Sequence, residues 1–370
     1  YREGSLEKTA LPKLRVLQKV YDTPDAEKIR EAAFYRYEPG KLSRQAADSL
    51  YAERNQGSVS RLELFASCAY AHFLRYGLEL MPRAEYTFEA VDFGSVYHGV
   101  LELFERSLKE DGISLRTLSE TILYSSARNE RRIRQMHRLL LRSVRTMQYQ
   151  MQKGSFEPAY FEQKFRMKGA FPLVGKIDRI DIRRENDEIY LKVMDYKSGR
   201  KEFSLDDVYY GLSMQLPVYM NAAVSFLQER YPQTTIIPAA MLYYRLQKPI
   251  IEIEGTKAEE EIEAEIRKQM KPDGLLLGED CVLTMLDQGF STDSDVMRVG
   301  RKKDGSFKAA SQVISQEDLG LLLSYTQKKA EQMMQQMAEG EIAVTPLKTG
   351  NHTSCDFCEY REVCRMDERI

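Results

Sequence analysis

The sequence predicts an α/β fold in which helices flank a mixed β-sheet. Apolar residues recur with a helical period over residues 121–153 and again over 205–229. Between these helices, residues 161–165 and 175–199 alternate as strands do. After the second helix, residues 236–246 form a further apolar strand. A helix, three strands, a helix and a strand in this order predict a sheet with helices packed on it.

Length, charge and cysteine count limit the class of protein. The chain has 370 residues, enough for one large or two ordinary domains. Its formal net charge is −2, so nucleic-acid binding would need local basic patches rather than a global field. No apolar run reaches the ~20 residues of a membrane-spanning helix. Five cysteines, an odd number, without a secretory signal argue against a disulfide framework. We therefore expect a cytoplasmic protein, and a start at Tyr1 rather than Met predicts a piece of a longer chain.

The most informative stretch is a hairpin over residues 175–199. A polar turn centred on residues 186–187 places Asp178 directly opposite Asp195, with Cβ atoms about 5 Å apart. Lys197 lies on the same face of its strand as Asp195, because residues two apart share a face. Two facing carboxylates repel each other unless a cation separates them, and a hard divalent metal would do so. Lys197 could then contact a phosphate or stabilise developing negative charge. The alternative is a surface ion pair, which Asp-x-Lys on a strand often is.

Two helices are expected before the helix at 121–153. Ser60 and Glu63 have the spacing of a capping box and begin a helix that carries Cys68. Asp92 is the expected N-cap of the next helix, which carries His98. A lone histidine in such a place is more often a surface residue than a metal ligand.

Further helices are expected after the hairpin. Gln215 and Tyr219 lie one turn apart on the helix at 205–229, and Pro217 predicts a kink or a late helix start. Residues 256–270 predict an acidic, solvated helix, and Ser315 caps a helix that runs to about residue 339.

The helix at 121–153 is strongly basic. It carries seven arginines between residues 128 and 145, among them Arg131, Arg134 and Arg138. Such a run is either a solvated helix face or a wall that follows phosphates beside a nucleic-acid channel. The sequence favours neither interpretation.

The C-terminal cysteines predict a metal site. Cys355, Cys358 and Cys364 have the spacing C-x2-C-x5-C, which in an intracellular chain is a strong metal-site signal. A fourth ligand must come from elsewhere: the candidates are Cys68, Cys281 and, more weakly, His352. Four thiolates suit either structural Zn²⁺ or a [4Fe–4S] cluster, and spacing favours neither. Cys281 is more simply a buried thiol.

Together these motifs resemble the RecB-family nucleases of the PD-(D/E)XK superfamily. The resemblance covers roughly residues 55–365 and rests on His98, G-x-x-Asp178, Asp195-Tyr-Lys197, Gln215-x-x-x-Tyr219 and the cysteines. One departure is that many relatives have proline after the first cysteine, where this chain has Ala69.

The resemblance implies a restriction-endonuclease-like sheet with a C-terminal iron–sulphur staple. It implies that His98, Asp178 and Asp195 are metal ligands and that Lys197 is a catalytic residue. As a hypothesis for the mechanism, the metal is Mg²⁺ (or Mn²⁺) and the Tyr196 carbonyl is a further ligand. The resemblance also implies a [4Fe–4S] cluster on Cys68, Cys355, Cys358 and Cys364, a set that we call the cysteine staple. It further implies that Gln215 and Tyr219 seat a single DNA strand that emerges from a partner helicase subunit. Glu162 is a candidate for a carboxylate behind the metal ligands.

The expected domain division follows from the same resemblance. Residues 1–56 are expected to be the tail of a preceding domain or a linker, and residues 57–365 the nuclease domain. Its parts are a core at 92–246, an inserted or flanking segment at 247–314, and a C-terminal helix with the staple at 315–365.

Two other functions compete with the nuclease. A catalytically silent DNA-binding scaffold is disfavoured by the intact Asp178, Asp195 and Lys197. A stand-alone exonuclease of the same superfamily is disfavoured by the extra segment at 250–340 and by the start without Met.

Overall fold

The computed structural model describes most of the chain beyond residue 40. The described ranges are 40–51, 56–81, 127–168, 172–199, 201–246, 258–350 and 352–364, with Lys28, Gly99 and Pro249 in addition. The chain divides into residues 1–40 and 41–370, and the sheet with its helices belongs to the second unit. The helix predicted from Asp92 and its His98 lie outside the described residues.

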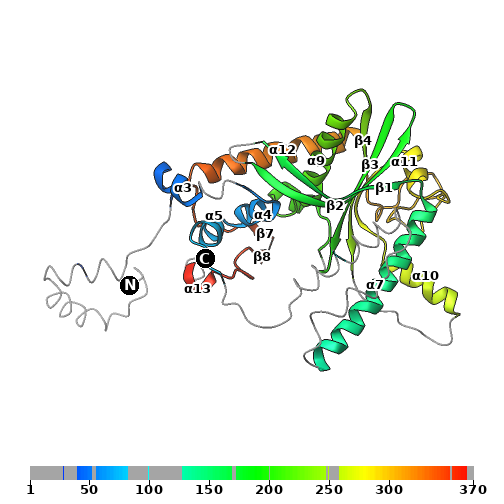
Figure 1. Cartoon of the computed structure of the whole chain (residues 1–370), viewed down its shortest axis with the longest axis horizontal. Helices are drawn as coiled ribbons and strands as arrows, with labels where there is room; N and C mark the ends of the chain where they lie inside the picture. The colour runs from blue at the N-terminus through cyan, green and yellow to red at the C-terminus, as the bar shows by residue number, and fades with distance from the viewer. Residues whose placement is uncertain are drawn as a thin grey trace, which may run out of the picture. The chain divides into compact units, whose positions relative to one another are not determined.

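A six-stranded mixed sheet forms the centre of the second unit (Figure 1). Its strands lie in sequence order: β1 Glu157–Met167, β2 Leu173–Glu185, β3 Glu188–Lys197, β4 Thr235–Arg245, β5 Asp273–Leu277 and β6 Val313–Ile314. β3 and β4 are parallel, as are β5 and β6, and the other neighbours are antiparallel. The predicted mixed sheet is therefore confirmed.

Helices cover both faces of this sheet. α9 (Gln215–Arg230) lies on the face that carries Asp195, and α7 (Ala127–Lys153) lies on the other, where the Tyr244 hydroxyl donates to the Ser143 carbonyl at 3.1 Å. Consequently β3 is buried at almost every position, on both faces. The period-2 pattern predicted one core face; the second becomes buried because α7 packs on it.

The helix predicted over 205–229 is two helices. α8 (Leu205–Tyr210) ends at Gly211, whose φ of 86° lies in the left-handed region, and α9 begins four residues later. Pro217 is the third residue of α9, where its missing N–H costs no helical hydrogen bond. The predicted late helix start is confirmed.

The first cysteine-bearing helix is also divided. α4 (Val59–Ser67) and α5 (Ala69–His72) meet at Cys68, whose extended backbone interrupts the helix, and a π-helical turn, η2 (Phe73–Gly77), follows. The capping box predicted at Ser60 is wrong. Ser58 is the N-cap, and its hydroxyl accepts the Arg61 N–H at 3.2 Å.

Seven shorter or peripheral elements complete the described fold. They are α3 Arg44–Tyr51, α10 Glu259–Gln269, α11 Asp280–Leu286, α12 Gln316–Ala338, β7 Lys348–Thr349, β8 His352–Thr353 and α13 Arg361–Cys364. The acidic helix and the Ser315-capped helix are confirmed as α10 and α12. Among the described residues, no helix is both long and apolar enough to cross a membrane.

Candidate active site

The hairpin has the predicted register. β2 and β3 pair from Glu185↔Glu188 to Arg179↔Met194, and one further step brings Asp178 level with Asp195. Both aspartates are buried, with 7% and 2% of their surface exposed. The tight turn is possible because Asn186, which tolerates the left-handed region, adopts a φ of 51°.

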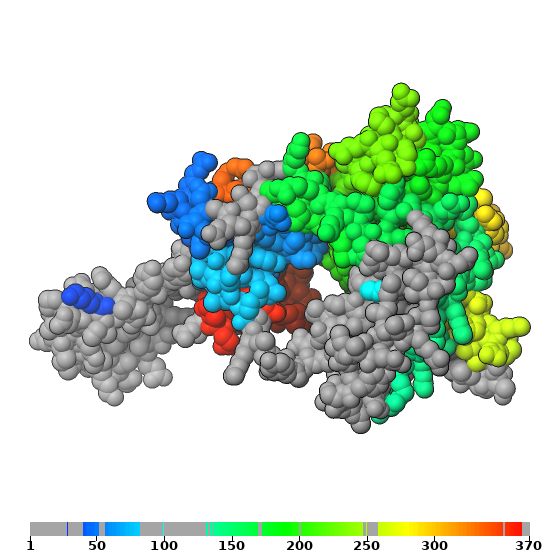
Figure 2. Space-filling view, viewed as in Figure 1, coloured from blue at the N-terminus to red at the C-terminus, as the bar shows by residue number. Residues whose placement is uncertain are grey.

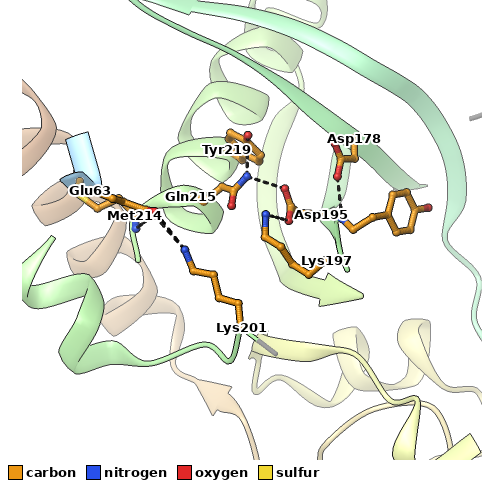
Figure 3. Close-up of polar contacts among 9 residues, drawn as sticks. Glu63, Asp178, Asp195, Lys197, Lys201, Met214, Gln215 and Tyr219 are labelled. Carbon is orange, nitrogen blue, oxygen red and sulfur yellow. Dashed lines mark hydrogen bonds and ion pairs between the residues drawn. The ribbon is translucent and has the colours of Figure 1, made fainter. Parts of the chain in front are cut away.

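Each aspartate is held in place by a neighbour (Figure 3). The Tyr196 N–H donates to Asp178 Oδ2 at 2.8 Å, so the first carboxylate is tied to the backbone of the strand that carries the second. Gln215 Nε2 donates to Asp195 Oδ1 at 2.8 Å. Two buried carboxylates from adjacent strands are thereby fixed at one end of the hairpin.

Lys197 completes this carboxylate site. Its Nζ lies 2.6 Å from Asp195 Oδ2 and 5.4 Å from the centre of the Tyr243 ring. The side chain is 21% exposed, so the ammonium group contacts the Asp195 carboxylate and still reaches solvent. The predicted grouping of Asp178, Asp195 and Lys197 is therefore present in the structure.

Gln215 and Tyr219 belong to the same site. Gln215 Nε2 also contacts the Tyr219 hydroxyl at 3.0 Å, and the Tyr219 ring packs edge-on against Phe165 with 5.6 Å between ring centres. Burial, with a smaller contribution from Asp195, raises the pKa of Tyr219, so its hydroxyl stays neutral and accepts the Gln215 N–H. Sequence spacing predicted the shared face but not the hydrogen bond to Asp195.

Gly175 explains the G-x-x-D motif. A Cβ at this position would lie 2.5 Å from two carbons of the Phe165 ring, so the absence of a side chain here lets this ring cross β2 and pack on Tyr219. We expect Gly175→Ala to displace the ring and to lower the free energy of unfolding by about 1–3 kcal/mol. Chemical denaturation checks this value.

A matched control is Gly320→Ala on α12, where a Cβ meets nothing within 4 Å. It should be neutral or stabilise by up to about 1 kcal/mol, because alanine is the better helix former. Equal effects of the two substitutions would contradict the assigned role of Gly175.

Two charged residues of the site were not selected from the sequence. Glu63 of α4 lies close to Lys201, with Oε2 at 3.3 Å from Nζ, and its Oε1 accepts the Met214 N–H at 2.9 Å (Figure 3). The sequence predicts Glu63 only as a capping residue. Its partners are 138 and 151 positions away, and no local pattern reports such a contact.

The other predicted site residues have separate surroundings. Arg131, Arg134 and Arg138 are exposed on α7. The Tyr196 ring is buried near Tyr244, with 6.1 Å between ring centres. Glu162 forms an ion pair with Lys176 on the neighbouring strand β2.

The four cysteines of the staple line one cavity. Cys68, Cys355, Cys358 and Cys364 surround a space of about 380 Å³, together with Tyr70 and Tyr76 among others. Cys68 is buried, and Cys355, Cys358 and Cys364 are half-buried. Figure 2 shows residues 352–364, coloured red, against residues 56–81, coloured blue to cyan. Between these two segments, the Tyr360 hydroxyl donates to the Leu80 carbonyl at 2.9 Å. Cys68 and the three C-terminal cysteines therefore line the same cavity. Within the described ranges, however, no group of three or more His, Cys, Asp or Glu side chains is placed to hold one metal ion.

A buried cation keeps the Cys68 segment in place. The Arg61 guanidinium lies between the rings of Tyr51 and Tyr76, at 5.1 and 5.2 Å, and Arg61 Nε donates to His72 Nε2 at 2.9 Å. Burial, together with Arg61, lowers the pKa of His72 to about 3, so the ring is neutral and can accept this bond. The two helices on either side of Cys68 are therefore joined by their own side chains.

The prediction that Cys281 is a buried thiol is wrong. Cys281 is exposed, because α11 buries Val282, Leu283, Met285 and Leu286 instead. His352, the weaker candidate for a fourth ligand, is exposed and contacts Asp356 at 3.3 Å. Neither residue lines the cavity of the staple.

A mixed sheet with two buried aspartates and a lysine at the end of adjacent strands is the arrangement that characterises the PD-(D/E)XK class. The family model for the PD-(D/E)XK nuclease superfamily matches residues 56–365, and the chain belongs to this superfamily.

Curated relatives align with most of this chain. Three bacterial proteins, each named as a subunit of an ATP-dependent helicase/deoxyribonuclease, match 93% of it. The protein from Lachnoclostridium phytofermentans is 36% identical, that from Bacillus anthracis 33% and that from Clostridioides difficile 32%. The chain spans about a third of their length, since the matches cover 32%, 32% and 33% of the three relatives.

Proposed function

We propose that this chain is the metal-dependent deoxyribonuclease domain of a helicase–nuclease complex. It hydrolyses phosphodiester bonds in single-stranded DNA that an AddA-type helicase subunit delivers, during processing of double-strand breaks for recombinational repair. The observation that carries the proposal is the buried Asp178–Asp195 pair with Lys197 beside it. The assignment to a helicase complex rests on the names of the relatives.

The carboxylate site suits Mg²⁺ or Mn²⁺. Two buried carboxylates offer hard oxygen donors, and their mutual repulsion is relieved by a divalent cation. Asp178 and Asp195 would hold the ion, with His98 and the Tyr196 carbonyl as further proposed ligands. When bound, such an ion supplies a more acidic water and stabilises charge on the scissile phosphate.

The remaining side chains orient the reaction. Gln215 keeps Asp195 from rotating, through its hydrogen bond to Oδ1, and the Tyr196 N–H does the same for Asp178. Lys197 has its ammonium group at Asp195 Oδ2 and partly in solvent, where it can contact a phosphate oxygen. Tyr219 holds Gln215 from the other side.

Incubation with labelled single-stranded and duplex DNA in Mg²⁺ tests the proposed function. Cleavage of the single strand, abolished by a chelator, is the expected result. Absence of cleavage with both Mg²⁺ and Mn²⁺, in the chain alone and together with the partner subunit, would overturn the proposal.

We also propose a [4Fe–4S] cluster in the cysteine staple. The placement of four cysteines around one cavity of about 380 Å³ supports it, because a cluster of eight atoms needs more room than a single zinc ion. Such a cluster would connect α4 and α5 to the C-terminal segment. Cys68, Cys355, Cys358 and Cys364 are the proposed ligands.

The basic face of α7 is proposed to follow the DNA backbone. Arg131, Arg134 and Arg138 are exposed, and their spacing places them along one side of the helix. We expect replacement of all three by Gln to flatten the salt dependence of single-strand binding. The slope of log K against log [salt] should fall by up to about 2, because each lost phosphate contact removes roughly 0.7.

Fluorescence anisotropy at a series of salt concentrations measures this slope. Lys302→Gln with Lys303→Gln, at two exposed positions of a turn, is the control and should leave the slope unchanged. An unchanged slope in the triple variant would show that these arginines do not contact DNA phosphates and that they form a solvated helix face.

A further inference from the structure

Glu63 reaches from α4 to the beginning of α9. Its Oε1 accepts the Met214 N–H at 2.9 Å, and Met214 is the N-cap residue of α9. Met214 forms no cap hydrogen bond through its own side chain, since a thioether is a weak acceptor. Glu63 therefore supplies from another helix the acceptor and the negative charge that a helix N-terminus requires.

The residue that this contact aligns is Gln215, the first residue of α9. Gln215 follows Met214 directly, and its Nε2 donates to Asp195 Oδ1 at 2.8 Å and lies 3.0 Å from the Tyr219 hydroxyl. A shift of the first turn of α9 would thus move the donor that orients Asp195. Figure 3 shows the route from Glu63 through Met214 and Gln215 to Asp195.

Glu63 also forms an ion pair with Lys201. The Nζ atoms of Lys197 and Lys201 both lie near the Tyr243 ring, at 5.4 and 5.8 Å from its centre. Glu63 pairs with Lys201 at 3.3 Å, and its side chain is only 20% exposed. The Lys201 ammonium is thus paired with Glu63, whereas the Lys197 ammonium is paired with Asp195.

We propose that Glu63 is a positioning residue of the nuclease site. It fixes the first turn of α9 so that Gln215 holds Asp195 opposite Asp178, and it acts through Gln215 rather than on the DNA. This inference rests on the proposed nuclease function.

The test is a double-mutant cycle in the full chain, with single-stranded DNA and Mg²⁺. Glu63→Ala should lower kcat on the order of tenfold to a hundredfold and leave KM for DNA within about twofold, because misplacement of a reacting group acts on the chemical step. Glu63→Gln should recover part of the loss, since its Oε1 can still accept the Met214 N–H. In the Gln215→Ala background, Glu63→Ala should add less than about threefold.

Two outcomes would overturn the proposal. If the effects of Glu63→Ala and Gln215→Ala multiply in full, Glu63 does not act through Gln215. If Glu63→Ala raises KM and leaves kcat unchanged, Glu63 serves DNA binding instead. Should Glu63→Ala melt below the assay temperature, Glu63→Asp replaces it. Asp keeps the charge but is one methylene shorter, so kcat should still fall at least about threefold at constant KM.

Controls separate this inference from the proposed function. Asp293→Asn removes a carboxylate from an ion pair with Lys308 and should leave kcat unchanged. An inactive wild-type chain would overturn the nuclease function and the inference with it. An active wild type, an inactive Asp195→Asn and a fully active Glu63→Ala would overturn the inference alone.

Discussion

Asp195→Asn is expected to reduce cleavage of single-stranded DNA by at least about a thousandfold, the loss typical of removing a group that stabilises transition-state charge. Asn matches Asp in size and can still accept the Gln215 hydrogen bond, so the loss is one of charge. The measurement is the initial rate of cleavage at saturating DNA and Mg²⁺.

A second measurement on the same variant is independent of activity. Mg²⁺ should raise the melting temperature of the wild type, because an ion that binds only the folded state stabilises it. The same titration should leave the melting temperature of Asp195→Asn unchanged. Asp187→Asn, in the turn of the same hairpin, is the matched control and should retain both rate and shift. Full cleavage by Asp195→Asn would show that the site lies elsewhere in the chain.

The carboxylate site could be predicted from the sequence because hairpin geometry is local. A two-residue turn fixes the register, and the register alone brings Asp178 level with Asp195. Strand parity then places Lys197 on the same face. These relations span fewer than about 20 residues, and each is dictated by backbone geometry rather than by tertiary packing.

The contacts of Glu63 could not be predicted from local geometry. Its contacts to Lys201 and Met214 join α4 to a segment far along the chain, and they depend on how whole helices pack. The break at Cys68 was missed for a related reason. Apolar residues recur with a helical period from residue 62 to residue 76, which predicts one continuous helix. Cys68 nevertheless has an extended backbone, with φ −169° and ψ 119°, and hydrophobic periodicity does not reveal this interruption. The exposure of Cys281 depended on which face of α11 is buried, and that follows from the sheet beneath it.

Cys68→Ser is expected to have the second largest effect. Cys68 joins α4 to α5 and faces the cavity that the C-terminal cysteines line, so it connects segments almost 300 positions apart. Purified without air, the wild type should be brown with a broad absorbance near ~400 nm, and Cys68→Ser should lose this band. Its melting temperature should fall by roughly 5–10 °C, because a group bound only by the folded state contributes several kcal/mol to stability.

Cys281→Ser is the matched control, since this thiol is exposed on α11 and lies outside the cavity. It should keep the absorbance, the iron content and the melting temperature. A colourless wild type with stoichiometric zinc would rule out the cluster and keep the four ligands.

Nuclease activity of Cys68→Ser adds a further measurement. The helix that ends at Cys68 carries Glu63, so loss of the staple should lower kcat through α4 even though the carboxylate site itself is intact. A Cys68→Ser variant that loses the absorbance but retains full kcat would show that α4 is held by the Arg61–His72 contact and its own packing alone.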